Sequence, residues 1–515
     1  MTNTRPIRSR IHLLKKKTGR RRLLRLPNRR QRLKRHPRRL HRRKRRLRTT
    51  AVRVRMICSK SDSNGWAANL RLSSRRKSLP VCSARDRCIS TLVGEYARRV
   101  AAMPRPVSRC VSAGHGMSDN ALAEALNEAL IAGLKERGDL NDPRLEDAFR
   151  SVRRHLFLPG APLDVAYRDE AVPIKTDVDG SLISSLSQPS MIAAMLGQLE
   201  LEPGQNVLEI GAGTGYSAAL MQHVVGPTGA VTSIEIDNHI IKLAEENLQR
   251  LGLGYKVRIV QGDGAAGYSP RASYDRIIAT ASVWDILPAW VNQLKPDGIL
   301  VAPIWLDALQ FSAAFRCIEG GALFSSDNIP CGFVRLRGPM AGPRLSKRVG
   351  ATSLVIVSNH VAGMDAAALE MLMLNDAEEN YLGLPLAISD YWNGLMPFLM
   401  LNLPDDARFA LYHLLGDKPA FGLDNPGFAL FVPGSGCFVP YNGRGFAIGF
   451  GSSDAVLALQ ELVQRWAASG RPTAARLRLY LTPPGQTSRV PAGARVFERP
   501  YHQLAVWLEQ EGAQA

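Results

Sequence analysis

The sequence predicts an α/β protein with a doubly wound, mostly parallel sheet, followed by a smaller α+β domain and preceded by a disordered basic extension. From residue 205 onward, apolar runs alternate with helical segments, and glycines or acids follow three successive runs. Charge is unevenly divided, because 36 of the 67 Lys and Arg residues but only 3 of the 45 Asp and Glu residues precede Met117. Residues 117–515 therefore carry a net charge of −11, although the whole 515-residue chain carries +22.

The extension comprises residues 1–116. Its first 55 residues hold 25 Lys or Arg and no acid, so like-charge repulsion opposes folding. Three interpretations remain open: an arm that binds phosphates, a targeting segment, or sequence upstream of a natural start at Met117, where a well-capped helix opens.

Cysteine and hydropathy patterns exclude several classes of protein. The seven cysteines form no CxxC pair and no even framework at short spacing, which argues against structural zinc and a disulfide scaffold. No metal site is expected. No run of 18 uncharged apolar residues occurs, and the N-terminus lacks the apolar core of a secretory signal. We therefore expect a cytoplasmic protein that does not span a membrane.

The body begins with two predicted helices. The first starts behind Ser118 or Asp119, and its apolar residues recur at spacings of three and four. The second covers residues 143–153. The stretch from there to residue 189 is rich in Pro, Asp, Gly and Ser and is predicted to be a surface loop. The apolar residues of the first helix are Leu122, Leu126, Leu130, Ile131 and Leu134.

The next segment follows a βαβ pattern. Its predicted helices cover residues 215–225, 238–252 and 285–294. Because such alternation is typical of a parallel sheet with helices on both faces, ligands are expected beyond the C-terminal ends of the strands. The predicted strands read "NVLEIGAG", "AVTSIEID", "VRIVQGDG", "YDRIIATA" and "GILVAPI".

Polar or glycine residues follow three of these strands. Gly211, Gly213 and Gly215 form a GxGxG pattern, in which glycine permits a tight turn and close approach of a ligand to the backbone. Taken alone, the glycines are equally consistent with an ordinary strand-to-helix turn. Glu235 ends the second strand, and Gly262-Asp263-Gly264 ends the third. Together these residues indicate a nucleoside site.

The whole arrangement resembles a class I S-adenosylmethionine methyltransferase, and specifically the protein-L-isoaspartate O-methyltransferase family. The resemblance covers residues 117–338 and implies a seven-stranded sheet. Residues 339–350 follow it in a segment rich in Gly, Pro and charge, which predicts a linker. Further matching segments are "AYRDEAVPI" from Ala166, "LSQP" from Leu186, "YDRIIATA" from Tyr274, "LKPDGILVAPI" from Leu294 and "GFVRLRG" from Gly332.

The resemblance also implies roles for individual residues. Ser187 would orient the acceptor carboxylate, although it also suits the cap of the following helix. Tyr167, Asp169 and Gln188 would line the substrate cleft, with an exposed loop as the alternative for Tyr167 and Asp169. Glu209 would meet the cofactor's ammonium group or serve a structural purpose. The remaining cofactor-binding candidates are Gly211, Gly213 and Gly215 for the methionine part, Glu235 for the ribose, and Gly262, Asp263 and Gly264 for the adenine.

The implied chemistry needs no strong base. A carboxylate is already ionised at pH 7, so it can attack the methyl group of S-adenosylmethionine once both are correctly held. The product would be the methyl ester of an isoaspartyl or aspartyl residue in a protein or peptide, which then closes to a succinimide.

Residues 351–515 are predicted to form the accessory α+β domain, with helices over 365–375 and 453–469. This extra length resembles longer variants of the family that act on ribosomally made peptides, so the domain would dock a leader or partner protein, and a dedicated peptide is the alternative acceptor. A nucleic-acid-associated methyltransferase is disfavoured, because the body is acidic and lacks an "NPPY"-like segment after the fourth strand. A cofactor-binding protein without activity also remains open.

Overall fold

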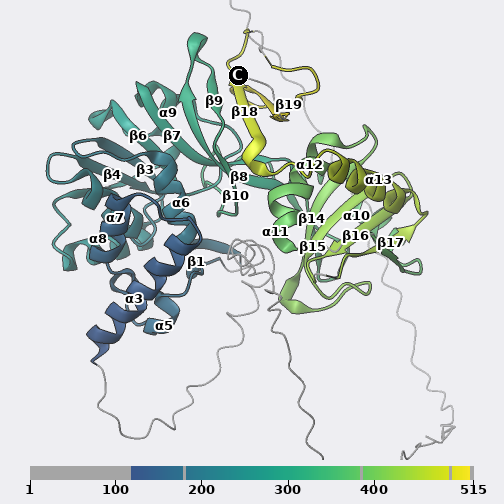
Figure 1. Ribbon diagram of the computed structural model, residues 1–515, viewed down its shortest axis with the longest axis horizontal. Coiled ribbons are helices and arrows are strands. Elements are labelled where there is room, and N and C mark those ends of the chain that lie inside the picture. Colours follow the sequence, from purple (N-terminus) through teal and green to yellow (C-terminus); the bar gives the residue numbers. More distant parts are fainter. Residues whose placement is uncertain (1–117, 178–180, 383–386, 443, 487–489, 511–515) are drawn as a thin grey trace, which may run out of the picture. The chain divides into compact units, whose positions relative to one another are not determined.

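A computed structural model describes residues 118–177, 181–382, 387–442, 444–486 and 490–510 of the chain (Figure 1). The predicted extension and Met117 lie outside the described residues. Within the described parts, two sheets and a separate hairpin are present. No described helix combines the length and apolar character needed to cross a membrane.

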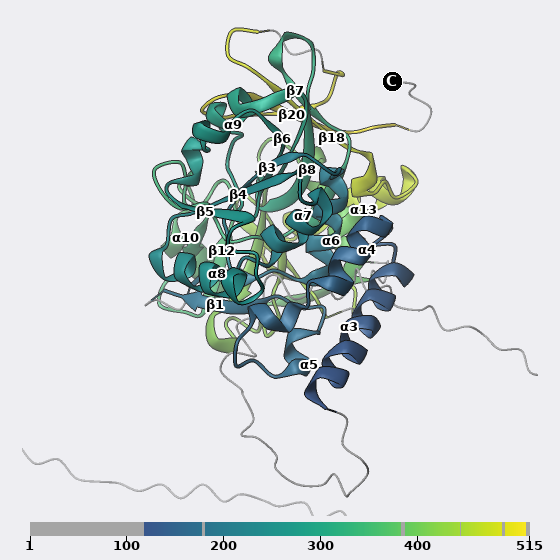
Figure 2. The ribbon, with the colours of Figure 1, turned by 90° about the vertical axis from the view of Figure 1, so that its left-hand side faces the viewer.

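The two helices predicted at the start of the body are confirmed. In α3 (Asp119–Glu136) the Ser118 side chain caps the N-terminus, and in α4 (Pro143–Ser151) Asp142 does so. Apolar residues on one face of each helix are buried in a common core with α6 (Pro189–Leu199) and α7 (Tyr216–Val225). Figure 2 shows these helices gathered on one side of the parallel strands.

The stretch between α4 and α6 is more ordered than the sequence predicted. It contains η2 (Arg154–Phe157), α5 (Leu163–Ala166) and a hairpin of β1 (Val172–Thr176) with β2 (Leu182–Leu186). The prediction of a continuous loop is therefore wrong for these residues. The strands are short and mostly half-buried, so their hydrophobic alternation is weak, and the Pro, Asp, Gly and Ser content masked them.

The main sheet confirms the predicted fold class. Its parallel strands lie in the order β5, β4, β3, β6, β7, with α8 and α9 among the connecting helices. Antiparallel β8 and β9 extend it beyond β7, and β10 pairs with β8. The bounds are β3 Asn206–Ile210, β4 Ala230–Glu235, α8 Asn238–Arg250, β5 Val257–Gln261, β6 Tyr274–Ala279, α9 Pro288–Gln293, β7 Leu294–Leu306, β8 Leu309–Cys317, β9 Leu323–Ser325 and β10 Asn328–Cys331.

The sheet has eleven strands and not the expected seven, and three of the extra strands come from the C-terminal end of the chain. β18 (Leu477–Thr482) pairs with β9, β20 (Gln503–Leu508) pairs with β18, and β19 (Arg495–Glu498) pairs with β20. The sequence analysis assigned all of residues 351–515 to the accessory domain, so it did not predict that β18, β19 and β20 pair in the first sheet. Runs such as "ARLRLYLTP" predict a strand but carry no information about which sheet the strand enters.

The second sheet consists of antiparallel strands in the order β11, β12, β14, β15, β16, β17, β13. Helix α13 covers β15 and β16, and the helices predicted over 365–375 and 453–469 are present as α10 and α13. The bounds are β11 Ser346–Arg348, β12 Leu354–Val357, α10 Ala366–Met373, β13 Glu378–Tyr381, α11 Ile388–Asp390, α12 Met396–Asn402, β14 Arg408–Leu414, β15 Gly427–Val432, β16 Ser435–Pro440, β17 Phe446–Gly451 and α13 Asp454–Ala468.

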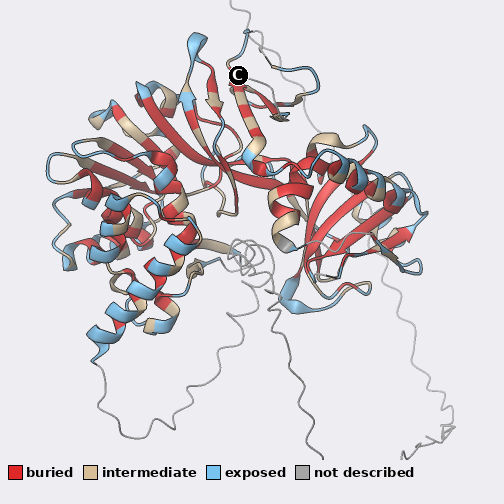
Figure 3. Cartoon of the chain, viewed as in Figure 1, coloured by how far each residue is buried: buried red, intermediate tan, exposed pale blue. Residues whose placement is uncertain are grey.

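One hydrophobic core joins the two sheets. It includes Ile304 of β7, Phe409 of β14 and Leu479 of β18, all fully buried. Figure 3 shows the buried strands of both sheets in red. The expected linker, 339–350, contains β11 and buries Leu345 and Val349, so it packs as part of the fold.

Candidate active site

A cavity of about 1230 Å³ opens beyond the C-terminal ends of β3 and β4. Its first wall comes from β2 and from the loops that follow β3, β4 and β6. Its second wall comes from β11, β12 and β14 of the second sheet. The site therefore lies where the sequence predicted a ligand, but two sheets build it.

The glycine loop forms part of the first wall. Gly211 has φ of 101° and Gly213 has φ of 53°, conformations that residues with a side chain rarely adopt. A Cβ atom at Gly211 would lie 2.6 Å from Oγ1 of Thr280, whose hydroxyl donates to the Gly211 carbonyl at 2.7 Å. Both glycines line the cavity. Gly215 lies outside it and brings α7 close to Leu248 of α8.

Glu235 lies at the end of β4 and lines the same cavity. Its Oε1 accepts hydrogen bonds from the backbone nitrogens of Ile236 and Asp237 at 2.9 and 3.0 Å. Arg337 donates to the same oxygen at 3.0 Å. The carboxylate is therefore fixed at the cavity wall, with Oε2 facing no donor among the described residues.

Asp237 anchors the neighbouring turn. It caps α8 and forms ion pairs with Lys175 at 2.6 Å and with Arg337 at 3.2 Å. Burial alone would raise the pKa of Asp237, but the hydrogen bonds from Lys175 and Arg337 outweigh it and hold the pKa well below its usual range. Arg337 thus ties the segment after β10 to the end of β4.

Of the three residues predicted to bind the adenine, only one lies at the cavity. Gly264 lines it, whereas Gly262 and Asp263 do not. Asp263 caps the short helix η3 (Gly264–Ala266) by accepting from the Ala265 nitrogen at 2.9 Å. A Cβ atom at Gly338 would lie 2.9 Å from Oδ2 of Asp263, so the backbone of Gly338 packs directly against the carboxylate.

Glu209 lies beneath the glycine loop and is fully buried. Its carboxylate accepts hydrogen bonds from Ser217 and, at 2.5 Å, from Ser233. Burial raises the pKa of Glu209 to about 7, against the opposing effect of the two serine hydroxyls. Glu209 does not line the cavity, whereas Ser217 does. This placement favours the structural alternative for Glu209.

Ser187 follows β2 and lines the cavity together with Gln188. Its backbone is held by Arg154, a fully buried residue whose guanidinium donates to the Ser187 carbonyl at 2.8 Å. Arg154 also donates to the carbonyls of Ala166 and Glu170, at 2.8 and 3.1 Å. One side chain therefore fixes three segments around the predicted catalytic serine.

The other substrate candidates lie behind the wall. Tyr167 is buried, and its hydroxyl lies 2.7 Å from Nδ1 of His155. Asp169 accepts from the Ser190 nitrogen and from Arg137, each at 2.8 Å. Neither residue lines the cavity, whereas Gln188 lines it and donates to the Asp169 carbonyl at 2.8 Å. Tyr167 and Asp169 thus support the Ser187 loop from behind.

Sequence reasoning missed three residues that shape the site. Arg154, Thr280 and Arg337 each hold backbone or carboxylate groups at the cavity. Arg154 lies in a run of two arginines, and Arg337 lies in "GFVRLRG", so both had the appearance of surface charge. Their partners are distant in sequence, and only the fold brings them together.

The residues present suit S-adenosylmethionine. The glycine loop leaves its backbone open to the cavity, and Glu235 presents a free carboxylate oxygen to it, as a ribose hydroxyl requires. The cavity also exceeds the roughly 300–1000 Å³ typical of small-molecule sites, which leaves room for an acceptor beside the cofactor.

Comparisons with known proteins identify the family of the part of the chain that carries the glycine loop. Residues 124–340 match the family model described as protein-L-isoaspartate(D-aspartate) O-methyltransferase. A protein-L-isoaspartate O-methyltransferase of Methanopyrus kandleri is 34% identical over 220 residues, which cover 43% of this chain and 95% of the relative. One from Methanococcus maripaludis is 38% identical over 218 residues, 41% of this chain and 97% of the relative.

A solved protein-L-isoaspartate O-methyltransferase structure aligns with a TM-score of 0.40 and 24% identity, covering 69% of this chain and 96% of its own. The two sequence matches span nearly the whole length of the relatives. The residues that match the family model include the glycine loop, Glu235 and the Ser187 segment. This chain therefore belongs to the protein-L-isoaspartate O-methyltransferase family, whose members transfer a methyl group from S-adenosylmethionine to isoaspartyl carboxylates in proteins.

Proposed function

We propose that Ser187 orients the acceptor carboxylate of an isoaspartyl residue beside S-adenosylmethionine bound at the glycine loop. The reaction is methyl transfer from S-adenosylmethionine to an isoaspartyl carboxylate in a protein. The observation that carries the residue assignment is the shared cavity, which Ser187, Gly211, Gly213 and Glu235 all line.

In this reaction the chain's own residues hold the cofactor and orient the acceptor carboxylate. The bound cofactor supplies a methyl group made electrophilic by its sulfonium. The acceptor carboxylate is ionised at pH 7, so no residue has to remove a proton from it. The Ser187 hydroxyl donates a hydrogen bond to one carboxylate oxygen and leaves the other oxygen to attack. Arg154 fixes the backbone of Ser187, so the point from which its hydroxyl projects is set before the acceptor arrives.

The cofactor-binding roles follow the three strand ends. Gly211 and Gly213 admit the methionine part, Glu235 accepts from the ribose through Oε2, and Gly264 borders the adenine. Asp263 does not line the cavity and caps η3, so we assign it the weaker role of shaping that turn.

Substitution of Ser187 by alanine tests the central assignment. Loss of one positioning hydrogen bond should lower kcat on an isoaspartyl peptide by about a hundredfold. Affinity for S-adenosylhomocysteine, measured by calorimetry, should stay unchanged, because Ser187 is assigned to the acceptor. Ser269→Ala, at an exposed serine outside the cavity, is the matched control. An unchanged kcat in Ser187→Ala would remove Ser187 from the mechanism.

The finer identity of the acceptor is a second proposal. Residues 346–476 include the second sheet, which supplies one wall of the cavity, and this favours a protein or leader-bearing peptide that contacts both sheets. A matched pair of peptides, one isoaspartyl and one aspartyl, separates the cases. Repair of damaged proteins predicts strong preference for the isoaspartyl peptide. Labelling of a leader-bearing peptide alone would indicate a dedicated substrate.

A further inference from the structure

The second wall of the cavity is one continuous face of the second sheet. In the register of the sheet, Arg348 of β11 lies opposite Val355 of β12, which lies opposite His413 of β14. Beside this row runs a second, made of Ser346, Val357 and Leu411. All six residues line the cavity. Because side chains alternate across a strand, both rows share one face, which we call the acceptor wall.

The opposite face of the same strands serves the domain's own core. Leu354, Ile356 and Tyr412 alternate with the residues of the acceptor wall and are buried. The sequence therefore separates two faces, one packed inside the second domain and one turned to the cavity. The cavity-facing residues include an arginine and a histidine, which a purely structural contact between domains does not require.

The charge of the cavity is strongly positive. Its described lining residues include a single carboxylate, Glu235, against five cationic side chains. One of the five, Arg337, is paired with Glu235 and Asp237. The other four form no ion pair with any described carboxylate. They are Arg335, Arg344, Lys347 and Arg348.

Contacts with backbone carbonyls hold three of these four cations in place without neutralising them. Arg335 donates to the carbonyls of Ala341 and Gly342, at 2.6 and 2.9 Å. Lys347 donates to the Val361 carbonyl at 3.4 Å, and Arg348 donates to the Ala351 carbonyl at 2.9 Å. The charge of Arg335 and Arg348 thus remains available to an anion in the cavity, whereas Lys347 lies opposite Ile356, on the other face of β11.

The remaining cation, Arg344, is exposed and makes no contact of this kind among the described residues. It stands two and four residues before Ser346 and Arg348, in step with the alternation of β11. Arg344 and Arg348 are therefore the cations best placed to meet a ligand along the acceptor wall.

We propose that the acceptor wall selects peptides that carry acidic side chains beside the isoaspartyl residue, with Arg344 and Arg348 as the specificity-determining residues. This inference rests on the proposed function, because the acceptor must enter this cavity to reach Ser187. The isoaspartyl carboxylate brings one negative charge to Ser187. The uncompensated arginines then favour further carboxylates from flanking residues of the same peptide.

A peptide series tests the proposal with the full-length enzyme. Three isoaspartyl peptides of equal length differ only in two flanking residues, which are both Glu, both Gln or both Lys. The wild-type enzyme should show about a tenfold higher kcat/KM for the Glu peptide than for the Gln peptide, and the lowest for the Lys peptide. The difference should lie mainly in KM and should shrink at high salt.

Two variants assign the effect to the acceptor wall. In Arg344→Gln/Arg348→Gln the preference for the Glu peptide should fall to about twofold or less. Arg344→Gln alone should reduce this preference partially. Because this single variant removes no described hydrogen bond, it should fold normally and gives a result even if the double variant misfolds. The matched control, Arg444→Gln/Arg465→Gln, removes the same charge from exposed sites outside the cavity and should keep the full preference.

The outcomes separate this inference from the proposed function. Methylation of all three peptides at equal kcat/KM, or a preference that survives in both Arg344 variants, overturns the inference and leaves the function intact. Absence of methyl transfer to every isoaspartyl peptide, with S-adenosylhomocysteine still bound, overturns the proposed acceptor site itself.

Discussion

Arg154 illustrates how one buried charge organises an active-site loop. Burial lowers its pKa to about 10, so the guanidinium remains protonated at pH 7. It donates to the carbonyls of Ala166, Glu170 and Ser187, and a carbonyl in a buried region is costly to leave without a donor. The residue therefore links the stability of this region to the position of Ser187.

Replacing Arg154 by methionine should lower the free energy of unfolding by about 3 kcal/mol, because three carbonyls in a buried or part-buried region lose a charged donor. It should also lower kcat, because Ser187 loses its support. Urea denaturation and steady-state kinetics measure the two effects. Arg150→Met, at an exposed arginine of the preceding helix, is the control and should change little. Equal stability of the two variants would contradict this account.

Glu209 makes stability depend on pH. Burial raises the pKa of Glu209 from 4.5 to about 7, so between these values the folded protein keeps a proton that the unfolded chain releases. The free energy of unfolding should therefore fall as pH rises from about 4.5 to about 7, by at most about 3 kcal/mol from this group.

Glu209→Gln removes this titration while its amide can still bond Ser217 and Ser233. Relative to wild type, the variant should gain stability as pH rises through that window, and the difference should level off above about pH 7. Urea denaturation of both proteins at several pH values measures it. A difference that does not vary with pH would mean that Glu209 titrates normally.

At the level of residues, four of the candidates that the motifs suggested lie together in the structure. Ser187, Gly211, Gly213 and Glu235 were predicted at the cavity, and all four line it. The sequence could not separate residues that face a ligand from residues that support one. Glu209 lies in the same motif yet points into the core, and Tyr167 and Asp169 lie behind Ser187, because these directions depend on tertiary packing.

Among secondary-structure elements, the long periodic helices and buried parallel strands were predictable because each carries its own pattern. The β1–β2 hairpin was not, since its strands are short and half-buried. The return of β18–β20 to the first sheet was also hidden. Pairing of β18 with β9 joins residues about 150 positions apart, as Leu479 opposite Ser325 shows, and no local pattern encodes it.

The C-terminal strands should therefore stabilise the methyltransferase sheet. Leu479→Ala, in β18, removes a fully buried side chain from the shared core and should lower the free energy of unfolding by about 3 kcal/mol. Hydrogen exchange should become faster in β9 and β8. Leu457→Ala, at an exposed position of α13, is the matched control and should have little effect. Faster exchange confined to the second sheet would contradict this pairing.

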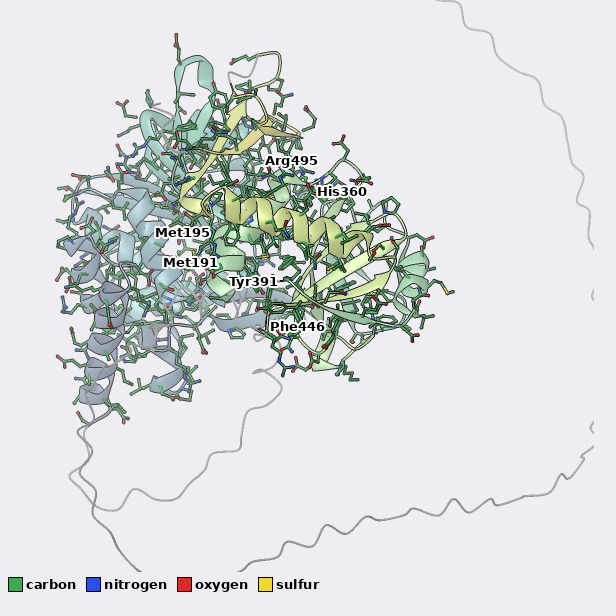
Figure 4. The ribbon with its side chains drawn as sticks, turned by 45° about the vertical axis from the view of Figure 1, so that its right-hand side comes forward. Met191, Met195, His360, Tyr391, Phe446 and Arg495 are labelled. Carbon is green, nitrogen blue, oxygen red and sulfur yellow. The ribbon has the colours of Figure 1, made fainter. Side chains whose placement is uncertain are left out.

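Across the described residues from 118 to 510, the two sheets behave as one packed body. Besides the common core, the Asn359 nitrogen donates to Oδ1 of Asp307 at 3.1 Å, and Arg495 donates to the Met400 carbonyl at 2.6 Å. His360, labelled with Arg495 in Figure 4, lies 3.9 Å from the Asp307 carboxylate. These contacts join the β7–β8 turn, the second domain and the C-terminal strands.

A chain of two independent domains would unfold in two steps, whereas a shared core predicts one. We expect calorimetry of residues 117–515 to give a single transition, with equal calorimetric and van't Hoff enthalpies. Residues 117–345 expressed alone should lack it, because β9 loses its partner β18 and core residues such as Ile304 become exposed. Two resolved transitions, or a cooperative transition in the shorter fragment, would mean that the second domain contributes to the cavity without stabilising the first.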